Sequence, residues 1–304
     1  MNTAYTILLQ IIKMFLMILV GYYLYRRKIT DDQLITGLSN ILLYVATPTL
    51  LVNSFLREYK SEEVPGLIFA FVLSFLIYVV LIITAEIFKR KGSSIEKFGI
   101  VFSNAGFIGI PLVSGVYGTE AVFYLAPYIA MFNIFVWTYG VYIMSKDPKE
   151  VSVIKVIKNP AIFSVLIGVL IYLLRIDLPS PISGSLSAFA GLNTPLAMIV
   201  LGAHIARSDL KKLFTDPKNY KVSFWRLVIA PLIILLLLYF VPQRWHEIKL
   251  ILLIAAAAPI GALSPVFAAM YNEDTAYAAQ TVCLSTLLSA LSMPIIMLLA
   301  EMLW

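Results

Sequence analysis

The feature that most constrains this chain is a series of apolar stretches, each about as long as a membrane-crossing helix, with short charged clusters between them. Roughly 20 apolar residues in a helix span the hydrocarbon core of a bilayer. A soluble protein of this length needs a polar surface, yet 61% of these residues are hydrophobic and only 13% are charged. The pattern is typical of an all-α integral membrane protein.

The apolar stretches predict ten transmembrane helices, at residues 5–24, 36–55, 66–88, 97–116, 122–144, 157–175, 185–205, 222–240, 249–269 and 276–300. No soluble domain fits between them, because the longest polar connectors, 146–158 and 207–221, each hold only about a dozen residues. The first stretch has neither a preceding basic residue nor a small-residue cleavage pattern. We therefore expect a retained helix there rather than a cleaved signal.

The distribution of lysine and arginine predicts the orientation of these helices. Sixteen of these basic residues fall in the loops after the odd-numbered spans, and five fall in the loops after the even-numbered spans. Positively charged loops tend to stay on the cytoplasmic side of a membrane. We therefore expect a multi-pass protein of the cell membrane with both termini on the extracytoplasmic side. The net charge of +6 follows from this topology, and no motif indicates a nucleic-acid partner.

Two pairs of similar segments predict an internal repeat. In the second and seventh spans, YVATPTLL resembles GLNTPLAM, and Thr47 matches Thr194 at an offset of 147 residues. In the fourth and ninth spans, PLVSGVYGTEAVFY from Pro111 resembles PVFAAMYNEDTAYA from Pro265 at an offset of 154 residues. Two matches at similar offsets indicate that the chain consists of two related halves.

The two halves are expected to be residues 1–145 and 157–304, with residues 146–156 as a short cytoplasmic connector. Five spans per half is an odd number, so the second half must enter the membrane in the opposite sense to the first. Inverted repeats of this kind recur in secondary transporters, in which a solute site forms between the halves near the bilayer midplane. The sequence therefore predicts a 5+5 inverted repeat that moves a small solute.

Glycine and proline in the middle of the fourth and ninth spans predict broken helices. The runs are SNAGFIGIP and APIGALSP, and the residues concerned are Gly106, Gly109, Pro111, Pro259, Gly261 and Pro265. Proline removes a backbone donor, and glycine admits conformations that other residues resist. Lipid cannot satisfy the freed backbone groups, so these must face protein, water or a solute. The N-terminus of a half-helix also favours an anionic group such as a carboxylate, so we expect substrate to bind at these six residues.

Polar side chains at this depth are few. Asn104 is the first candidate for solute binding because its amide both donates and accepts hydrogen bonds; the alternative is that it only satisfies freed backbone. Ser264 offers a hydroxyl in the second break, or it bonds within its own helix. Asn133 and Gln280 are further candidates to face the same cavity.

Four runs of this chain resemble the auxin efflux carrier family, which includes plant auxin exporters and bacterial organic-acid permeases: LLYVATPTLLVNSF, FSNAGFIGIPL, NTPLAMIVLGA and APIGALSPVFAAMY. The likeness covers nearly the whole chain. It implies that spans 1, 2, 6 and 7 form a scaffold, which often dimerises, and that spans 3–5 and 8–10 form a moving transport domain. It also implies that the broken spans 4 and 9 cross in that domain, with Asn104, Pro111, Pro259 and Pro265 at the substrate site.

The resemblance is to the compact prokaryotic form, because the long hydrophilic loop of the plant members is missing between the halves. Ile260 stands where some plant carriers have a polar side chain, which argues against auxin as the solute. We expect an elevator-type transporter of a small organic anion. The alternatives are a sodium-coupled organic anion symporter of the bile-acid type and a membrane sensor that moves no solute.

Ionisable residues within the spans are scarce, so the driving ion stays open. Lys13 lies about two turns inside the first span, where it either reaches the outer interface or faces a polar cavity. Glu86 is expected to pair with Lys89 and Arg90 at the cytoplasmic interface. Sodium bound by backbone carbonyls at the breaks is a further possibility.

Two other ionisable residues are expected near the cytoplasmic ends of spans 7 and 8: His204 close to the headgroups, and Arg226 reaching the interface along its aliphatic stem. No cofactor is indicated, since Cys283 has no partner for a disulfide or a metal site. The two histidines, His204 and His246, fall near opposite faces and no HExxH or GxSxG run occurs, so we expect no enzyme. A channel is disfavoured because no repeated filter or charged ring is evident.

Overall fold

The protein is all-helical in the residues that its computed structural model describes, 3–88 and 92–304. The α-helices are α1 (Thr3–Arg26), α2 (Asp32–Ile41), α3 (Thr47–Asn53), α4 (Glu63–Phe88), α5 (Ser94–Val101), α6 (Ile110–Tyr117), α7 (Val122–Phe135), α8 (Val141–Ser145), α9 (Val153–Ile157), α10 (Pro160–Leu173), α11 (Ser180–Gly191), α12 (Asn193–Arg207), α13 (Leu210–Thr215), α14 (Pro217–Phe224), α15 (Ala230–Tyr239), α16 (His246–Ala257), α17 (Ser264–Met270) and α18 (Thr275–Leu303).

Within these ranges, seven helical stretches are long and apolar enough to cross a membrane: Tyr5–Arg26, Asp32–Asn53, Glu63–Ile87, Thr119–Ser145, Ser180–Arg207, Pro217–Tyr239 and Thr275–Leu303. Two shorter apolar helices cover Ala105–Tyr117 and Pro160–Leu173. The prediction of an all-α, multi-pass membrane protein is confirmed. Ten crossings, the inverted order of the halves and their bounds stay predictions.

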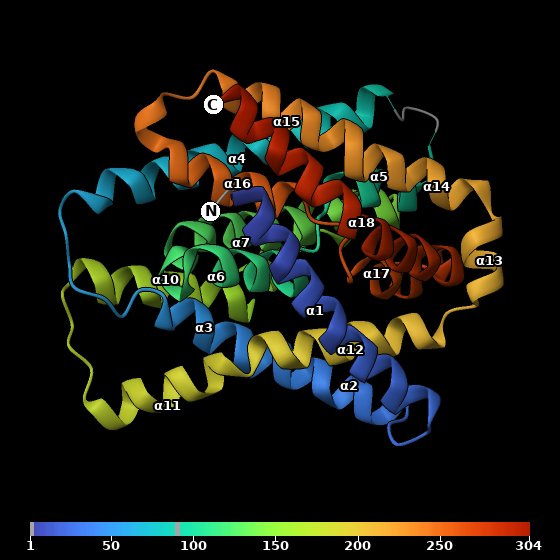
Figure 1. Ribbon diagram of the computed structural model, residues 1–304, viewed down its shortest axis with the longest axis horizontal. Coiled ribbons are helices and arrows are strands. Elements are labelled where there is room, and N and C mark those ends of the chain that lie inside the picture. Colours follow the sequence, from blue (N-terminus) through green and yellow to red (C-terminus); the bar gives the residue numbers. More distant parts are fainter. Residues whose placement is uncertain (1–2, 89–91) are drawn as a thin grey trace.

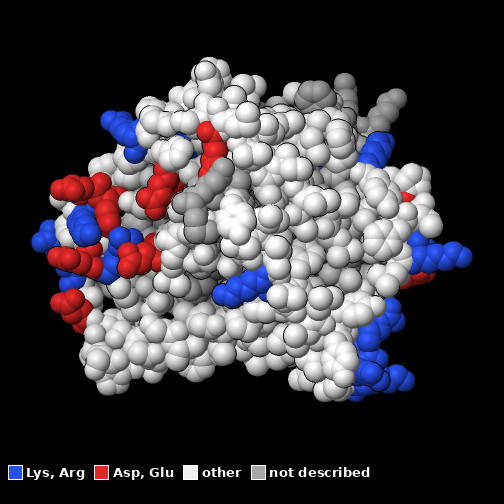
Figure 2. Space-filling view, viewed as in Figure 1, with Lys and Arg blue, Asp and Glu red and all other residues white. Residues whose placement is uncertain are grey.

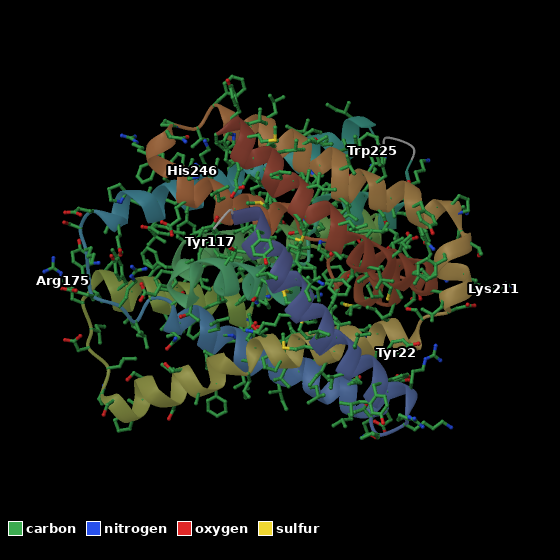
Figure 3. All side chains as sticks on the ribbon, in the orientation of Figure 1. Tyr22, Tyr117, Arg175, Lys211, Trp225 and His246 are labelled. Atoms are coloured by element: carbon green, nitrogen blue, oxygen red, sulfur yellow. The ribbon has the colours of Figure 1, made fainter. Side chains whose placement is uncertain are left out.

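The loops gather at two opposite ends of the molecule. Arg175 and His246, which follow even-numbered predicted spans, lie toward one end, and Tyr22 and Lys211, near loops after odd-numbered spans, lie toward the other (Figure 3). Both chain termini lie in the half that also holds Arg175 (Figure 1). Figure 2 shows charged side chains mostly at these two ends and a broad, mainly uncharged band between them. This arrangement is what a lipid-facing belt with polar ends requires.

Short turns of π-helix interrupt the long helices, and three of the four within residues 3–88 and 92–304 precede a proline. They are Leu42–Ala46, Ala105–Gly109, Val136–Gly140 and Trp225–Ile229. Pro48, Pro111 and Pro231 each come two residues after such a turn. A proline ring clashes with the carbonyl four residues before it and offers no N–H, so a wider turn accommodates it without ending the helix.

Helices α1 and α12 pack closely along their lengths, because glycines face one another at the contact. A Cβ atom added at Gly202 of α12 would lie 2.1 Å from the carbonyl oxygen of Ile18, and one added at Gly21 of α1 would lie 2.3 Å from that of Ile199. Nearby, α3 packs on α10 and α11, and α4 packs on α7. Small residues permit this backbone approach, as is usual for helix pairs in membranes.

Candidate functional site

Two helix breaks meet at the centre of the molecule. Helix α5 ends at Val101 and α16 ends at Ala257, and each is followed by extended backbone. Ser103 pairs with Ile260 in an isolated antiparallel bridge. Two backbone hydrogen bonds hold the bridge. The backbone N–H of Asn104 donates to the carbonyl of Pro259 at 2.7 Å, and the backbone N–H of Gly261 donates to the carbonyl of Phe102 at 2.9 Å. The freed backbone groups of one break thus satisfy those of the other.

The first break falls earlier than its glycines and proline suggest. Gly106 and Gly109 lie in the π-helical turn Ala105–Gly109, and Pro111 lies in the first turn of α6. The non-helical backbone is instead at residues 102–104. The predicted break is therefore present within the run SNAGFIGIP, but the wide turn accommodates Pro111 within a helix.

A cavity of about 450 Å³ opens beside the crossing. Its lining residues come from both breaks, from the π-helical turns Leu42–Ala46, Ala105–Gly109 and Val136–Gly140, and from α2, α3, α7, α9, α10, α12 and α17. They are Ser39, Leu43, Tyr44, Thr47, Ser103, Asn104, Gly106, Phe107, Ile129, Phe132, Asn133, Trp137, Ile154, Lys155, Lys158, Asn159, Pro160, Ala161, His204, Gly261, Ala262, Leu263 and Val266. Four of the ten residues predicted to bind solute are among them: Asn104, Gly106, Asn133 and Gly261.

Asn104 is buried, and the described structure pairs only one end of its side-chain amide. Its Oδ1 accepts a hydrogen bond from the backbone amide of Phe107 at 3.3 Å and caps the helical turn that follows the break. Its Nδ2 has no partner among the described residues. A buried amide N–H without a partner is costly, so this group is suited to donate to a bound molecule.

Asn133 also lines the cavity, but other protein groups already occupy its amide. Its Nδ2 donates to the carbonyl of Ile129 at 2.8 Å, and its Oδ1 accepts from Asn159 Nδ2 at 3.0 Å. Asn159 in turn caps the start of α10 by accepting from the amides of Ala161 and Ile162. Asn133 therefore holds the cavity wall in place.

The remaining predicted residues do not line this cavity: Gly109, Pro111, Pro259, Ser264, Pro265 and Gln280. The Ser264 hydroxyl is fully buried and has no partner in the described structure. The expectation that Gln280 faces the same cavity is wrong. Its Oε1 accepts from Asn219 Nδ2 at 3.3 Å, and it lines a separate polar hollow of about 600 Å³ with Lys212 and Asp274.

The charged side chains that line the cavity are basic. Lys155, near the end of the connector, and Lys158, just after it, are exposed and line the same cavity as the buried Asn104. No aspartate or glutamate is found in the described lining. In the sequence, these two lysines indicate only the topology. Both lysines come just before Asn159 and Pro160, where α10 begins. That position is the sequence signal that they lie beside the cavity, which Asn159 and Pro160 also line.

Arg226 has a different place from the one predicted. It was expected to reach the interface, but it is fully buried in the π-helical turn Trp225–Ile229. Its Nε donates to the carbonyl of Ala258 at 2.9 Å and its Nη1 to that of Ile100 at 2.8 Å. Its Nη2 donates to the carbonyl of Ala256. The guanidinium thus joins the ends of both helices that stop at the crossing.

Glu86 and Lys13 lie away from the cavity. Glu86 accepts hydrogen bonds from Lys97 Nζ at 2.7 Å and from the Tyr139 hydroxyl at 2.6 Å. Its expected partners Lys89 and Arg90 lie outside the described residues. Lys13 is exposed on α1 and lines none of the described cavities, which argues against a cavity-facing role.

The comparisons with known proteins agree with this architecture. A family model described as a membrane transport protein matches residues 6–155 and 148–297. The chain is 26% identical, over 305 residues, to an uncharacterized transporter of Methanothermobacter thermautotrophicus. That alignment covers 94% of this chain and 95% of the relative. It is 24% identical, over 291 residues, to an uncharacterized transporter of Methanocaldococcus jannaschii, with 91% and 93% covered. The chain therefore belongs to this family of membrane transport proteins, the auxin efflux carrier family that its sequence resembles.

Proposed function

We propose that the protein is a secondary transporter that carries a small organic anion, a carboxylate with an apolar body, across the cell membrane. The observation that carries the proposal is the cavity at the crossing. Its charged lining groups in the described structure are basic, and the buried Asn104 Nδ2 is free to donate a hydrogen bond. These are the features of a site for an anion rather than for a cation.

The walls of the cavity indicate the body of the solute. Phe107, Phe132 and Trp137 present aromatic surface, and Leu43 and Ile129 present aliphatic surface. A small, strongly hydrated dianion gains little from such walls, whereas an aromatic or branched monocarboxylate buries its apolar part there. The carboxylate would face Asn104, and Lys155 and Lys158 would attract it toward the cavity.

The cavity lies between two groups of helices whose relative movement would expose it to either side. Thr47 and Pro160 belong to spans 2 and 6 of the expected scaffold, whereas Asn104 and Gly261 belong to the expected transport domain. In an elevator cycle the second group slides along the first and takes the solute with it. A site lined by both groups opens and closes as they slide.

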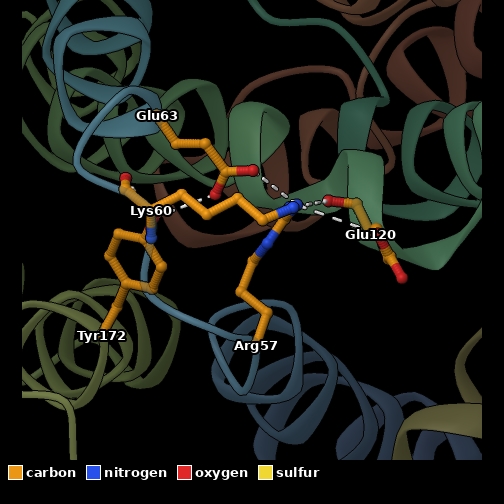
Figure 4. Close-up of polar contacts among 5 residues, drawn as sticks. All are labelled: Arg57, Lys60, Glu63, Glu120 and Tyr172. Atoms are coloured by element: carbon orange, nitrogen blue, oxygen red, sulfur yellow. Dashed lines mark hydrogen bonds and ion pairs between the residues drawn. The ribbon is translucent and has the colours of Figure 1, made fainter.

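The end of the molecule opposite the connector is held by a polar cluster, which we define as Arg57, Glu63, Glu120, Tyr172 and the backbone of Lys60 (Figure 4). Arg57 Nη2 lies 2.8 Å from Glu63 Oε1 and 3.8 Å from Glu120 Oε2. The Tyr172 hydroxyl donates to Glu63 Oε2 at 2.9 Å. Arg57 and Tyr172 come from the expected scaffold, and Glu63 and Glu120 from the expected transport domain. The cluster therefore supports a state closed at that end and open at the connector end.

The remaining partners are the bilayer and a second copy of the chain. Large apolar side chains are exposed along α1, α10 and α11, as a lipid-facing surface requires. The homodimer contact would be made by the expected scaffold helices, which are α1, the pair α2 and α3, α10, and the pair α11 and α12. Cross-linking in membranes tests that contact independently of transport.

Uptake into proteoliposomes tests the proposed function. Radiolabelled malate, benzoate and indole-3-acetate are offered under imposed proton or sodium gradients, and saturable uptake of at least one is expected. Replacing Lys155 and Lys158 by glutamine should raise the half-saturation concentration by about threefold to tenfold at low salt, because it removes the attraction at the cavity. The control replaces Lys211 and Lys221, which are exposed but do not line the cavity.

The outcomes separate the alternatives. An anion carrier is supported if uptake changes when the cavity lysines are replaced and does not change when the control lysines are replaced. Folded protein that binds one of the acids but moves none is a sensor and overturns the transport proposal. Strict dependence on a sodium gradient favours a symporter of the bile-acid type.

A further inference from the structure

We propose that Arg226 is a resident cation: its guanidinium permanently fills the carbonyl-lined position at the crossing that a coupled sodium ion would otherwise occupy. The solute cycle would then run without sodium at this position. This inference rests on the proposed function, because it concerns the driving ion of that transport. It concerns a residue that does not line the cavity.

The geometry is that of a cation site already filled. Three carbonyl oxygens converge on the guanidinium, one from α5 (Ile100) and two from the end of α16 (Ala256 and Ala258). The arginine side chain that donates to these three oxygens is fully buried. Both broken helices thus end on the same positive group, and the position is closed to solvent.

The chemistry of those oxygens explains why a cation is needed. The last carbonyls of a helix lack intrahelical partners and carry the negative end of the helix dipole. In transporters with broken helices, such helix ends and unwound carbonyls coordinate sodium. The fork of a guanidinium donates several hydrogen bonds in one plane and can satisfy the same oxygens.

The charge of Arg226 is constant, since arginine does not lose its proton in proteins. No carboxylate forms an ion pair with it among the residues the structure describes. A sodium ion placed beside it would meet a like charge and find these three carbonyls already engaged. Arg226 is therefore a positioning residue that joins the two breaks and replaces an ion.

The experiment compares the thermal unfolding midpoint and carboxylate uptake in sodium, choline and guanidinium chloride. Wild-type protein should behave alike in sodium and choline. Arg226→Ala opens the position, so its midpoint should fall and then rise selectively in sodium or guanidinium, because a ligand that binds only the folded state stabilises it. Its uptake should drop by about tenfold or more in choline and recover in part with guanidinium.

A matched control is Lys249→Ala, which removes another buried cation at a distance from the crossing. Lys249 is 1% exposed, and its Nζ lies 3.3 Å from the carbonyl oxygen of Val241 and over the ring of Trp304. This variant should lose stability without any selective response to sodium or guanidinium. A response equal to that of Arg226→Ala would show a general salt effect and overturn the inference.

Other results also decide it. A wild-type midpoint or uptake that depends on sodium contradicts a resident cation. So does an Arg226→Ala variant that transports in choline as wild type does. If Arg226→Ala does not fold, Arg226→Lys retains the charge and should stay independent of sodium. If wild type moves none of the carboxylates, the proposed function fails, while the unfolding measurements still decide the role of Arg226.

Discussion

Asn104 does two things with one side chain. Its Oδ1 caps the helical turn after the break, and its Nδ2 has no partner among the described residues although Asn104 is only 4% exposed. An unpaired buried donor costs about 1–3 kcal/mol. A solute carboxylate that accepts from Nδ2 would remove this cost, so the arrangement is understandable as a site prepared for an acceptor.

Replacing Asn104 should therefore impair transport more than stability. Asn104→Ala is expected to lower uptake at subsaturating solute by about tenfold, which corresponds to the loss of about 1.4 kcal/mol in binding. Asn104→Asp should be worse, because it brings a negative charge to an anion. The measurement is initial-rate uptake into proteoliposomes with matched protein content.

Asn53→Ala is the control for this pair, since the Asn53 side chain accepts a hydrogen bond from Ser187 at 2.9 Å and does not line the cavity. It should transport at the wild-type rate. An Asn104→Asp variant as active as wild type would contradict the site.

Residue type predicts some of the residues at the site from the sequence, but it does not predict all of them. An amide beside a helix break was a sound indicator for Asn104, which does line the cavity. Gln280 was chosen for its depth alone, but depth does not reveal which way a side chain on a long apolar helix points. The sequence predicts Arg226 at the interface because it falls near the cytoplasmic end of the eighth predicted span. Only the three-dimensional meeting of carbonyls from residues 100, 256 and 258 shows why it is buried.

At the scale of elements, the contact between α1 and α12 depends on glycine. A methyl group at Gly202 would lie 2.1 Å from the Ile18 carbonyl oxygen and 2.6 Å from the Tyr22 nitrogen, and backbone atoms cannot move aside as a side chain can. Gly202→Ala should lower the free energy of unfolding by about 1–3 kcal/mol through overpacking. Thermal unfolding of the purified protein in detergent measures the change.

Gly184→Ala in α11 provides the comparison, because no described atom outside the adjacent backbone of its own helix lies within 4 Å of the added methyl group. That variant should be neutral or more stable by up to about 1 kcal/mol, since alanine favours a helix over glycine. Equal losses in the two variants would show that close packing at Gly202 is not the cause.

The helix breaks were predictable from the sequence, but their positions were not. Glycine and proline correctly marked the fourth and ninth spans as discontinuous. The first break nevertheless falls at residues 102–104, because that backbone is stabilised by a bridge to Ile260 from the other half of the chain. Pairing between segments more than 150 residues apart leaves no local signal in composition.

At the scale of the whole molecule, the positive residues predict one orientation in the membrane. Peptide tags at the two termini should both be accessible from outside intact cells, and a tag inserted in residues 146–156 should be accessible only after the cells are opened. Protease or antibody accessibility measures this. Termini on opposite sides would mean an odd number of crossings and would exclude the 5+5 inverted repeat.

The polar cluster opposite the connector should control which end of the transporter is open. Arg57 and Glu63 are largely buried, with 19% and 16% of their side chains exposed, so their ion pair is less screened than one at a surface. The pair joins the loop after α3 to the first turn of α4, which are the two parts that an elevator movement would separate. Breaking it should favour the state open at this end, because a contact present in one state alone stabilises that state.

Arg57→Ala should accordingly reduce access to the cavity from the connector end. A cysteine introduced at the cavity residue Ser39, with Cys283→Ser in the background, is labelled by a membrane-impermeant maleimide added from that side. The labelling rate should fall by about threefold or more as the population shifts. It should recover when Arg57→Glu is combined with Glu63→Arg, which restores the pair with its charges exchanged. Arg244→Ala, which removes an arginine stacked on Trp245, should leave the rate unchanged. Unchanged labelling in Arg57→Ala would mean that the cluster only joins loops, and that the closed end is held by the packing of α3 on α10 and of α4 on α7.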